Sequence, residues 1–219
     1  MIGDLLKSEI EDRFEKIKTS SPLYLNAVDG TLTAKQIHQY LANIRYLVSH
    51  TPIHLKRALL LSRQREQAAL AEFFAAKIEE EVGHDAWAED DMKNLSRRSA
   101  EKDLPAELVD PMRQLVEYIG QVIERDPLLY LAYILFSEYF TVIAGPQWLA
   151  LLERNCGIPA SSMSVVGKHS ELDKEHTRED IDVIDRLMSP GVKPDQAVEV
   201  LNRAFGFYES FAARVGSLS

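Results

Sequence analysis

The sequence of 219 residues has one cysteine, Cys156, and so cannot form an internal disulfide. It also lacks a basic excess, since 34 acidic residues against 25 lysines and arginines leave a formal charge of -9, which does not suit a phosphate backbone. The longest uninterrupted apolar run, 128–136, is well short of the roughly 20 residues of a membrane helix. We therefore expect neither a disulfide scaffold, nor a nucleic-acid partner, nor a membrane partner.

Two further signals are missing. No segment shows the alternation of apolar and polar residues that a half-buried strand requires, and the Asp29-Gly30 pair is followed by a helical pattern. The first seven residues are too polar for a secretory signal, which predicts a cytoplasmic location. The composition, 46% apolar and 27% charged, is that of an ordinary globular chain. A single domain over residues 1–219 is the simplest interpretation.

What the sequence does contain is helical periodicity. Proline and glycine divide the apolar pattern into segments, and linkers between them are short. Pro52 either separates two segments or kinks one helix. The pattern predicts an all-α bundle of about seven helices, over roughly 3–19, 33–50, 52–64, 67–95, 105–125, 127–155, 161–188 and 194–216.

The segment that begins near Pro127 is apolar on all sides, as expected of a central helix. Between Pro127 and Leu152 its one charged residue is Glu138. A buried carboxylate is costly unless it meets a metal, a cation or hydrogen-bond donors. Glu138 is therefore a candidate ligand, with a protonated glutamate beside a hydroxyl such as that of Tyr130 as the alternative.

The segment 161–188 places His169, Asp173 and His176 on one stripe of a helix. Valine, isoleucine and leucine continue this stripe on both sides, so it is predicted to face the core. Asp180 lies one turn further on and could orient an imidazole by accepting a hydrogen bond. The alternative is an exposed acidic face that happens to carry histidines.

A Glu-x-x-His pair, Glu81 and His84, occurs in the segment 67–95 and brings a carboxylate and an imidazole to one face. Glu81 continues a stripe of apolar residues, whereas Glu79 points to the opposite side. Glu80 is intermediate and remains the second choice.

Together these segments supply three carboxylates and three imidazoles from different helices, without a thiolate. Such ligands suit iron, or manganese, and six are enough for two ions with positions left for oxygen and substrate. A single iron held by the His169 helix alone is the lesser version. The predicted metal ligands are Glu81, His84, Glu138, His169, Asp173 and His176.

This ordered set resembles the haem-oxygenase-like di-iron oxidases and oxygenases, whose all-helical fold is shared with haem oxygenase, thiaminase II (TenA) and the pyrroloquinoline quinone synthesis protein PqqC. The early stretches Ser21-Pro22-Leu23-Tyr24 and Asp29-Gly30-Thr31-Leu32-Thr33 are also similar to the opening of that superfamily. Some members place the first glutamate two turns before its histidine, where this chain has Lys77.

The resemblance implies two irons bound in a site that is often labile. These irons would activate dioxygen for the oxidation of a small amine- or carboxylate-bearing substrate. The reaction would be N-oxygenation, C–C cleavage or desaturation, in specialised or cofactor metabolism, and the protein a homodimer. The alternatives are a metal-free TenA/PqqC-like enzyme or cofactor-binding protein with the same cavity, and a non-catalytic helical module. Haem oxygenase activity is not expected, because the first 37 residues contain no histidine.

Other residues are candidates for substrate contacts. His50 and His54 are one helical turn apart, Tyr130 and Tyr133 lie on the central segment, and Arg45 could hold a carboxylate. Cys156 lies past the position of the thiaminase II nucleophile, in an expected helix C-terminal turn, and is interpreted as a structural thiol.

Overall fold

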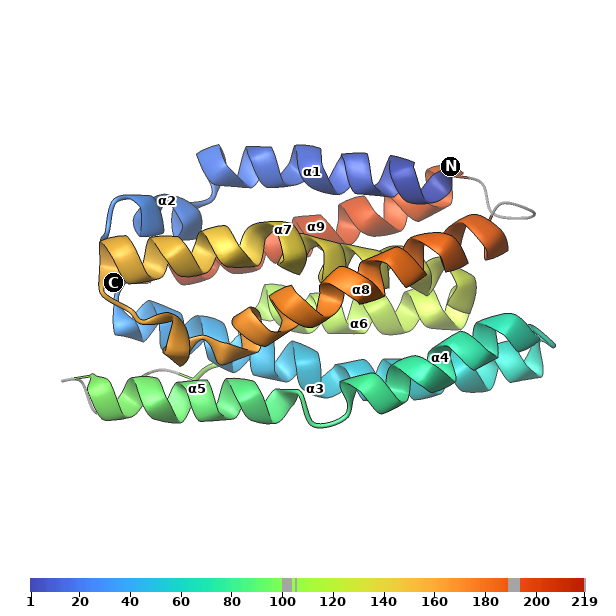
Figure 1. Ribbon diagram of the computed structural model, residues 1–219, viewed down its shortest axis with the longest axis horizontal. Helices are drawn as coiled ribbons and strands as arrows, with labels where there is room; N and C mark the ends of the chain where they lie inside the picture. The colour runs from blue at the N-terminus through green and yellow to red at the C-terminus, as the bar shows by residue number, and fades with distance from the viewer. Residues whose placement is uncertain (100–103, 105, 189–193, 219) are drawn as a thin grey trace.

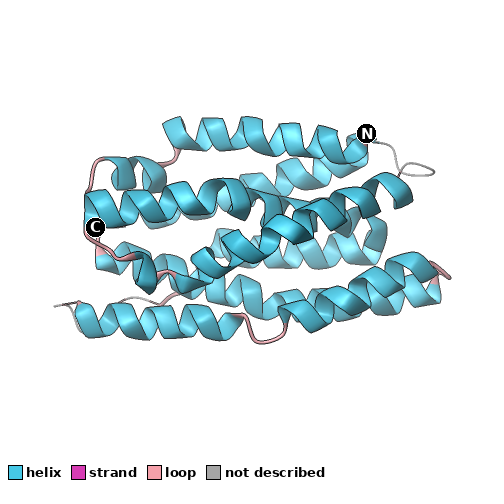
Figure 2. Cartoon of the chain, viewed as in Figure 1, coloured by secondary structure: helices cyan, strands magenta, loops and turns pink. Residues whose placement is uncertain are grey.

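The computed structural model describes residues 1–99, 104, 106–188 and 194–218, and in these residues the chain is helical with no strand (Figures 1 and 2). The predicted all-α bundle is confirmed. The helices are α1 (Ile2–Ser20), α2 (Pro22–Val28), α3 (Ala34–Gln64), α4 (Ala68–Glu81), α5 (Asp85–Arg98), α6 (Asp110–Arg125), α7 (Tyr130–Cys156), α8 (Ser164–Leu187) and α9 (Pro194–Gly216), with 3-10 turns at Pro127–Leu129 and Ala160–Ser162.

The helix α3 joins two of the predicted segments, because it continues through Pro52. It begins at a capping box, in which the Gln36 amide donates to the Thr33 hydroxyl and the Thr33 amide donates to the Gln36 side chain. The short helix α2 was not predicted, since seven residues are too few to show a period of 3.6.

One predicted helix, 67–95, is two helices in the structure. The helix α4 ends at Glu81, Gly83 adopts a left-handed φ of 91°, and α5 begins at Asp85. Glycine reaches this conformation without the steric cost that a Cβ would bring. The helix α6 begins at Asp110 rather than at Pro105, which lies outside the described residues.

The helix α7 is the centre of the bundle, with α1 along one side and α8 crossing it on another (Figure 1). Within the described residues, the segment Pro127–Cys156 is the one helix long and apolar enough to cross a membrane, and 61% of its most apolar window is buried inside the fold. Burial of this kind is expected of a core helix that is apolar on all sides.

The helices α7 and α8 approach closely at Gly145. A Cβ at this position would lie 2.0 Å from the Ser170 hydroxyl oxygen and 3.3 Å from Val166 Cγ1. The Ser170 hydroxyl donates to the Val166 carbonyl at 2.7 Å, so it cannot move without losing that bond. Glycine at 145 therefore sets the spacing between the two helices that carry most of the candidate ligands.

Gly145→Ala is expected to lower the free energy of unfolding by about 1–3 kcal/mol, because the added methyl overpacks the contact with α8. Gly206→Ala is the matched control, since a Cβ there meets nothing within 4 Å and alanine favours a helix by up to about 1 kcal/mol. Urea denaturation of the two variants checks the difference. Equal stabilities would show that the α7–α8 contact tolerates a methyl group.

Candidate metal centre

The six predicted ligands come together where the end of α4 and the start of α5 meet α7 and α8. Four of the six side chains are no more than 9% exposed, namely Glu81, His84, Glu138 and Asp173. His169 and His176 are partly buried. The turn at Gly83 does not separate Glu81 from His84, because Glu81 Oε2 lies 3.3 Å from His84 Nδ1.

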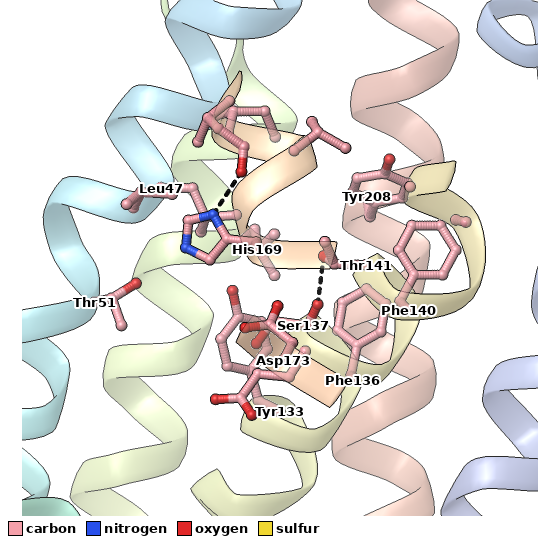
Figure 3. A pocket seen from close by; sticks show the side chains of 18 of the residues that line it. Leu47, Thr51, Tyr133, Phe136, Ser137, Phe140, Thr141, His169, Asp173 and Tyr208 are labelled. Carbon is pink, nitrogen blue, oxygen red and sulfur yellow. Dashed lines mark hydrogen bonds between the residues drawn. The ribbon is translucent and has the colours of Figure 1, made fainter. Parts of the chain in front are cut away.

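The first group of donors that could hold an ion consists of Glu81, His84 and His169, with one ligand atom from each lying within 4.8 Å of the others. His169 Nδ1 lies 2.7 Å from the carbonyl oxygen of Val165. A carbonyl can only accept, so Nδ1 must carry the proton in the neutral ring, which leaves the lone pair on Nε2. Figure 3 shows the imidazole of His169 held in this way, with Asp173 nearby.

The second group consists of Glu81, Glu138 and His176, again with ligand atoms within 4.8 Å. His176 Nδ1 lies 3.6 Å from Asp173 Oδ1, and His176 Nε2 lies 3.5 Å from Glu80 Oε2. Glu81 belongs to both groups, whereas Glu80 reaches the cluster from its edge. The structure thus places both candidates for the first carboxylate near the site, with Glu81 more central.

A residue that the sequence analysis did not select, Lys77, lies inside this cluster and is only 2% exposed. Its ammonium donates to Glu138 Oε1 at 3.0 Å and Oε2 at 3.2 Å. Asp180 Oδ1 lies 3.4 Å and Glu80 Oε2 3.5 Å from the same nitrogen. The charged partner of Asp180 is therefore Lys77, and not the imidazole that the sequence analysis expected it to orient.

Burial and charge act in opposite directions on these groups. Burial raises the pKa of Glu138 well above its ordinary value, and the Asp180 carboxylate raises it further, against the lowering effect of Lys77. Burial likewise raises the pKa of Asp180. For Lys77, burial favours the neutral amine, but the Asp180 and Glu138 carboxylates outweigh it and raise the pKa. Lys77 is thus a permanent cation at neutral pH, and one proton can be shared between Glu138 and Asp180.

Glu81 behaves differently from its neighbours. Burial opposes its ionisation, but the neighbouring imidazoles, that of His84 foremost and then that of His169, outweigh burial and lower the pKa of Glu81. Glu81 is therefore ionised in the one position that both donor groups share, as a metal ligand must be.

Several buried polar atoms of the cluster have no hydrogen-bond partner among the described residues. They are His84 Nδ1, His176 Nδ1, Asp173 Oδ1, Glu80 Oε2 and both carboxylate oxygens of Asp180. Buried polar atoms are nearly always paired, and a concentration of exceptions in one place points to a group that the protein chain does not itself supply. All of these atoms are nitrogen or carboxylate oxygen, the donors that suit iron and manganese.

An apolar cavity of about 180 Å³ opens onto this cluster (Figure 3). Its polar end includes Lys77, Glu81, Glu138, His169 and Asp173. The rest of its wall is mainly aromatic and aliphatic, from Phe14, Tyr24, Tyr40, Leu47, Phe136, Phe140, Trp148, Val166 and Tyr208 among others.

The candidate substrate contacts divide into two sets. Tyr130 and Tyr133 line the cavity, as the sequence analysis proposed. Arg45 does not line it and forms a surface ion pair with Glu89 at 2.9 Å. His50 lies within 2.8 Å of the Tyr46 carbonyl, also outside the cavity wall. Arg45 and His50 thus do not touch this cavity, because the helix face that carries them is turned away from it.

His54 is a buried residue outside the cavity wall, where its ring packs edge-on against Tyr130 at 6.3 Å between centroids. Burial, assisted by the charge of His50, lowers its pKa from 6.5 to about 4. In the unfolded chain His54 is therefore protonated below about pH 6.5, whereas in the folded protein it is protonated only below about pH 4.

Wild-type stability is accordingly expected to fall as the pH is lowered from 7.5 to 5, with about 2 kcal/mol of the loss due to His54. His54→Phe keeps a ring against Tyr130 but removes the titrating group. Urea denaturation at both pH values measures the difference, and the same pH dependence in the variant and the wild type would contradict this assignment.

Cys156 is the last residue of α7, and Gly157 caps the helix in a left-handed conformation. Burial raises the pKa of the thiol, and its sulfur lies 3.7 Å from the Ala27 carbonyl oxygen. It does not line the cavity. A thiol with a raised pKa outside the site is consistent with the structural role that was predicted.

The arrangement defines a haem-oxygenase-like fold with a cluster of carboxylates, imidazoles and one lysine in its core. A domain of unknown function with a haem oxygenase-like fold from Shewanella denitrificans superposes with a TM-score of 0.85 at 17% identity, over 97% of this chain and 90% of that one. A TenA homologue from Pyrococcus furiosus gives a TM-score of 0.75 at 15% identity, over 99% of this chain and 100% of that one. For a TenA homologue from Pseudomonas syringae pv. tomato the TM-score is 0.69 at 16% identity, covering 96% and 92% of the two chains.

At these identities the likeness shows the fold, which is the one that the sequence resemblance implied. Comparison with known protein families finds no matching family, and comparison with curated proteins finds no matching sequence. The chemistry of the site has therefore to be argued from its own residues.

Proposed function

We propose that this protein is a dioxygen-dependent non-haem iron oxidase or oxygenase. The observation that carries the proposal is that ionised Glu81 lies together with His84 and His169 at the polar end of an apolar cavity. Carboxylate and imidazole donors on facing helices of a bundle are the usual ligands of non-haem iron, with manganese as the other candidate.

The residues fit such an ion. His84 Nδ1, Asp173 Oδ1 and His176 Nδ1 are buried without a hydrogen-bond partner among the described residues, which suits donors to a cation. The set contains no thiolate that would favour zinc or copper. Bound iron would supply the activation of dioxygen. Glu81, His84 and His169 would hold it, with Asp173 and His176 next to them.

The chain contributes orientation and exclusion of water. The Val165 carbonyl fixes the ring of His169, so its Nε2 is presented to the site without reorganisation. The stacked rings of Tyr130 and Tyr133, 5.9 Å apart, add apolar surface to the wall of the cavity. Their hydroxyls stay protonated, because burial raises the pKa of both, and they can donate a hydrogen bond to a bound substrate.

The cavity suggests the shape of the substrate. A volume of about 180 Å³ is close to the roughly 150 Å³ of an apolar cavity known to accept benzene, which points to a body about the size of one ring or a short chain. Charged side chains lie at one end only. We therefore propose a small substrate with an apolar body and a single amine or carboxylate directed at the metal, modified by N-oxygenation, C–C cleavage or desaturation.

One observation favours a second candidate. Lys77 already neutralises part of the charge on Glu138 and Asp180 without any metal, as a TenA/PqqC-like enzyme or cofactor-binding protein working without metal would require. Two of the structural relatives are TenA homologues. This alternative differs from the iron proposal in one respect that can be measured, namely its metal content.

The test is anaerobic loading with Fe(II), removal of unbound iron, and elemental analysis, followed by exposure to oxygen in an absorption spectrometer. The iron proposal expects stoichiometric iron and a spectral change on oxygenation. Protein that retains no iron after loading, yet remains folded, would overturn it and favour the metal-free alternative. Sedimentation of the same sample checks the predicted homodimer.

A further inference from the structure

The contacts of Lys77 bear on how many metal ions the site can hold. The ammonium donates to both oxygens of Glu138 and lies 3.4 Å from Asp180 and 3.5 Å from Glu80. Glu80 in turn lies 3.5 Å from His176, so this ammonium lies among the donors of the second group. In the described part of the chain no lysine or arginine forms an ion pair with the first group, whose side chains contact one another, the Val165 carbonyl and the ring of Trp87.

We infer that the site holds one metal ion rather than two, with the Lys77 ammonium as the built-in second cation. The ion would be bound by Glu81, His84 and His169, and Lys77 would compensate Glu138 and Asp180. This inference rests on the proposed function, because it concerns the same ligands.

Three physical points support it. A divalent ion bound to Glu138 would have to take oxygens that now accept hydrogen bonds from an ammonium. It would also lie close to that positive charge at a buried position, where charges repel more strongly than in water. Lys77 cannot readily leave, because it is 2% exposed and its removal would leave two buried carboxylates unpaired. The ammonium nitrogen also lies over the ring of Phe73, 5.8 Å from its centroid, where a cation–π contact helps to hold it.

The amino-acid sequence itself places the Lys77 ammonium next to the second group, through the position of Lys77 on α4. Lys77 and Glu81 are four residues apart on α4 and so lie on the same face, one turn from each other. The same face of α4 thus carries Glu81, the ligand that both groups share, and Lys77, the cation of the second group.

Metal stoichiometry tests the inference without any assay of activity. Wild-type protein is titrated anaerobically with Fe(II) and analysed after desalting, and a parallel sample loaded with Mn(II) is examined by electron paramagnetic resonance. We expect saturation at one equivalent and the signal of an isolated Mn(II) ion. Lys77→Met removes the charge while keeping much of the length, and is expected to bind two equivalents with a spin-coupled Mn(II) pair.

Lys77→Arg is the matched control, because it keeps the charge and is expected to bind one equivalent. Lys77→Met with Asp180→Asn loses one charge of each sign, so it preserves the test if the single variant does not fold. Two equivalents in the wild type, or one equivalent in both Met variants, would overturn the inference and leave the iron proposal standing. No metal in the wild type would overturn both.

Discussion

Protein that carries His169→Ala together with His176→Ala is expected to bind Fe(II) at least about 100-fold more weakly than the wild type. The two imidazoles come from one face of α8, and one of them belongs to each group of donors. Loss of a residue that only supports a ligand commonly costs 10–100-fold in metal affinity, so removing the imidazoles themselves should cost at least the upper value. Competition with a chelator of known affinity measures the change.

His50→Ala is the matched control for this experiment. His50 is also on a long helix and is partly buried, but it does not line the cavity. Its removal is expected to leave the affinity for iron unchanged. If the double variant binds Fe(II) as the wild type does, the assignment of α8 as a ligand helix is wrong.

The second large effect concerns the stability of the metal-free protein. Lys77→Met is expected to lower the free energy of unfolding by about 3–5 kcal/mol, because it removes one partner of a buried ion pair and leaves Glu138 and Asp180 facing each other. Urea denaturation in the presence of a chelator measures this loss. Saturating Fe(II) is expected to restore part of it, since an ion bound only by the folded state stabilises that state.

The double variant Lys77→Met with Asp180→Asn should recover part of the loss in metal-free protein, because the remaining Glu138 no longer has a charged neighbour. An effect of less than 1 kcal/mol for Lys77→Met alone would show that water or a proton compensates the two carboxylates equally well. In that case Lys77 would not be the structural cation described here.

Much of the fold follows from local patterns. Periodicity was sufficient for the long helices, and the absence of charge around Glu138 was sufficient to identify α7 as the core helix. The break between α4 and α5 was not predicted, because a single glycine such as Gly83 is tolerated in many helices and its φ depends on the tertiary structure.

The site shows where sequence reasoning reaches its limit. Each predicted ligand could be found from one helix, as a polar residue on an apolar stripe, and Lys77 carried the same signal because it lies between Phe74 and Glu81 on the buried face of α4. A lysine is ordinarily exposed, and its burial depends on carboxylates from α7 and α8 that are 61 and 103 residues away. Such partners become visible only when the helices are packed together. Arg45 and His50, by contrast, were predicted to contact the substrate and do not line the cavity. Their position depends on the rotation of α3 about its axis, which the sequence alone does not reveal.

The most direct test of the account is an iron-edge anomalous difference map from crystals grown and soaked with Fe(II) in the absence of oxygen. The account predicts one strong peak, about 2.0–2.3 Å from a carboxylate oxygen of Glu81 and from a ring nitrogen of His84 and of His169, with Lys77 still paired with Glu138. A map without a peak at Glu81, from crystals shown to contain iron, would contradict the central claim that this fold holds a non-haem iron centre.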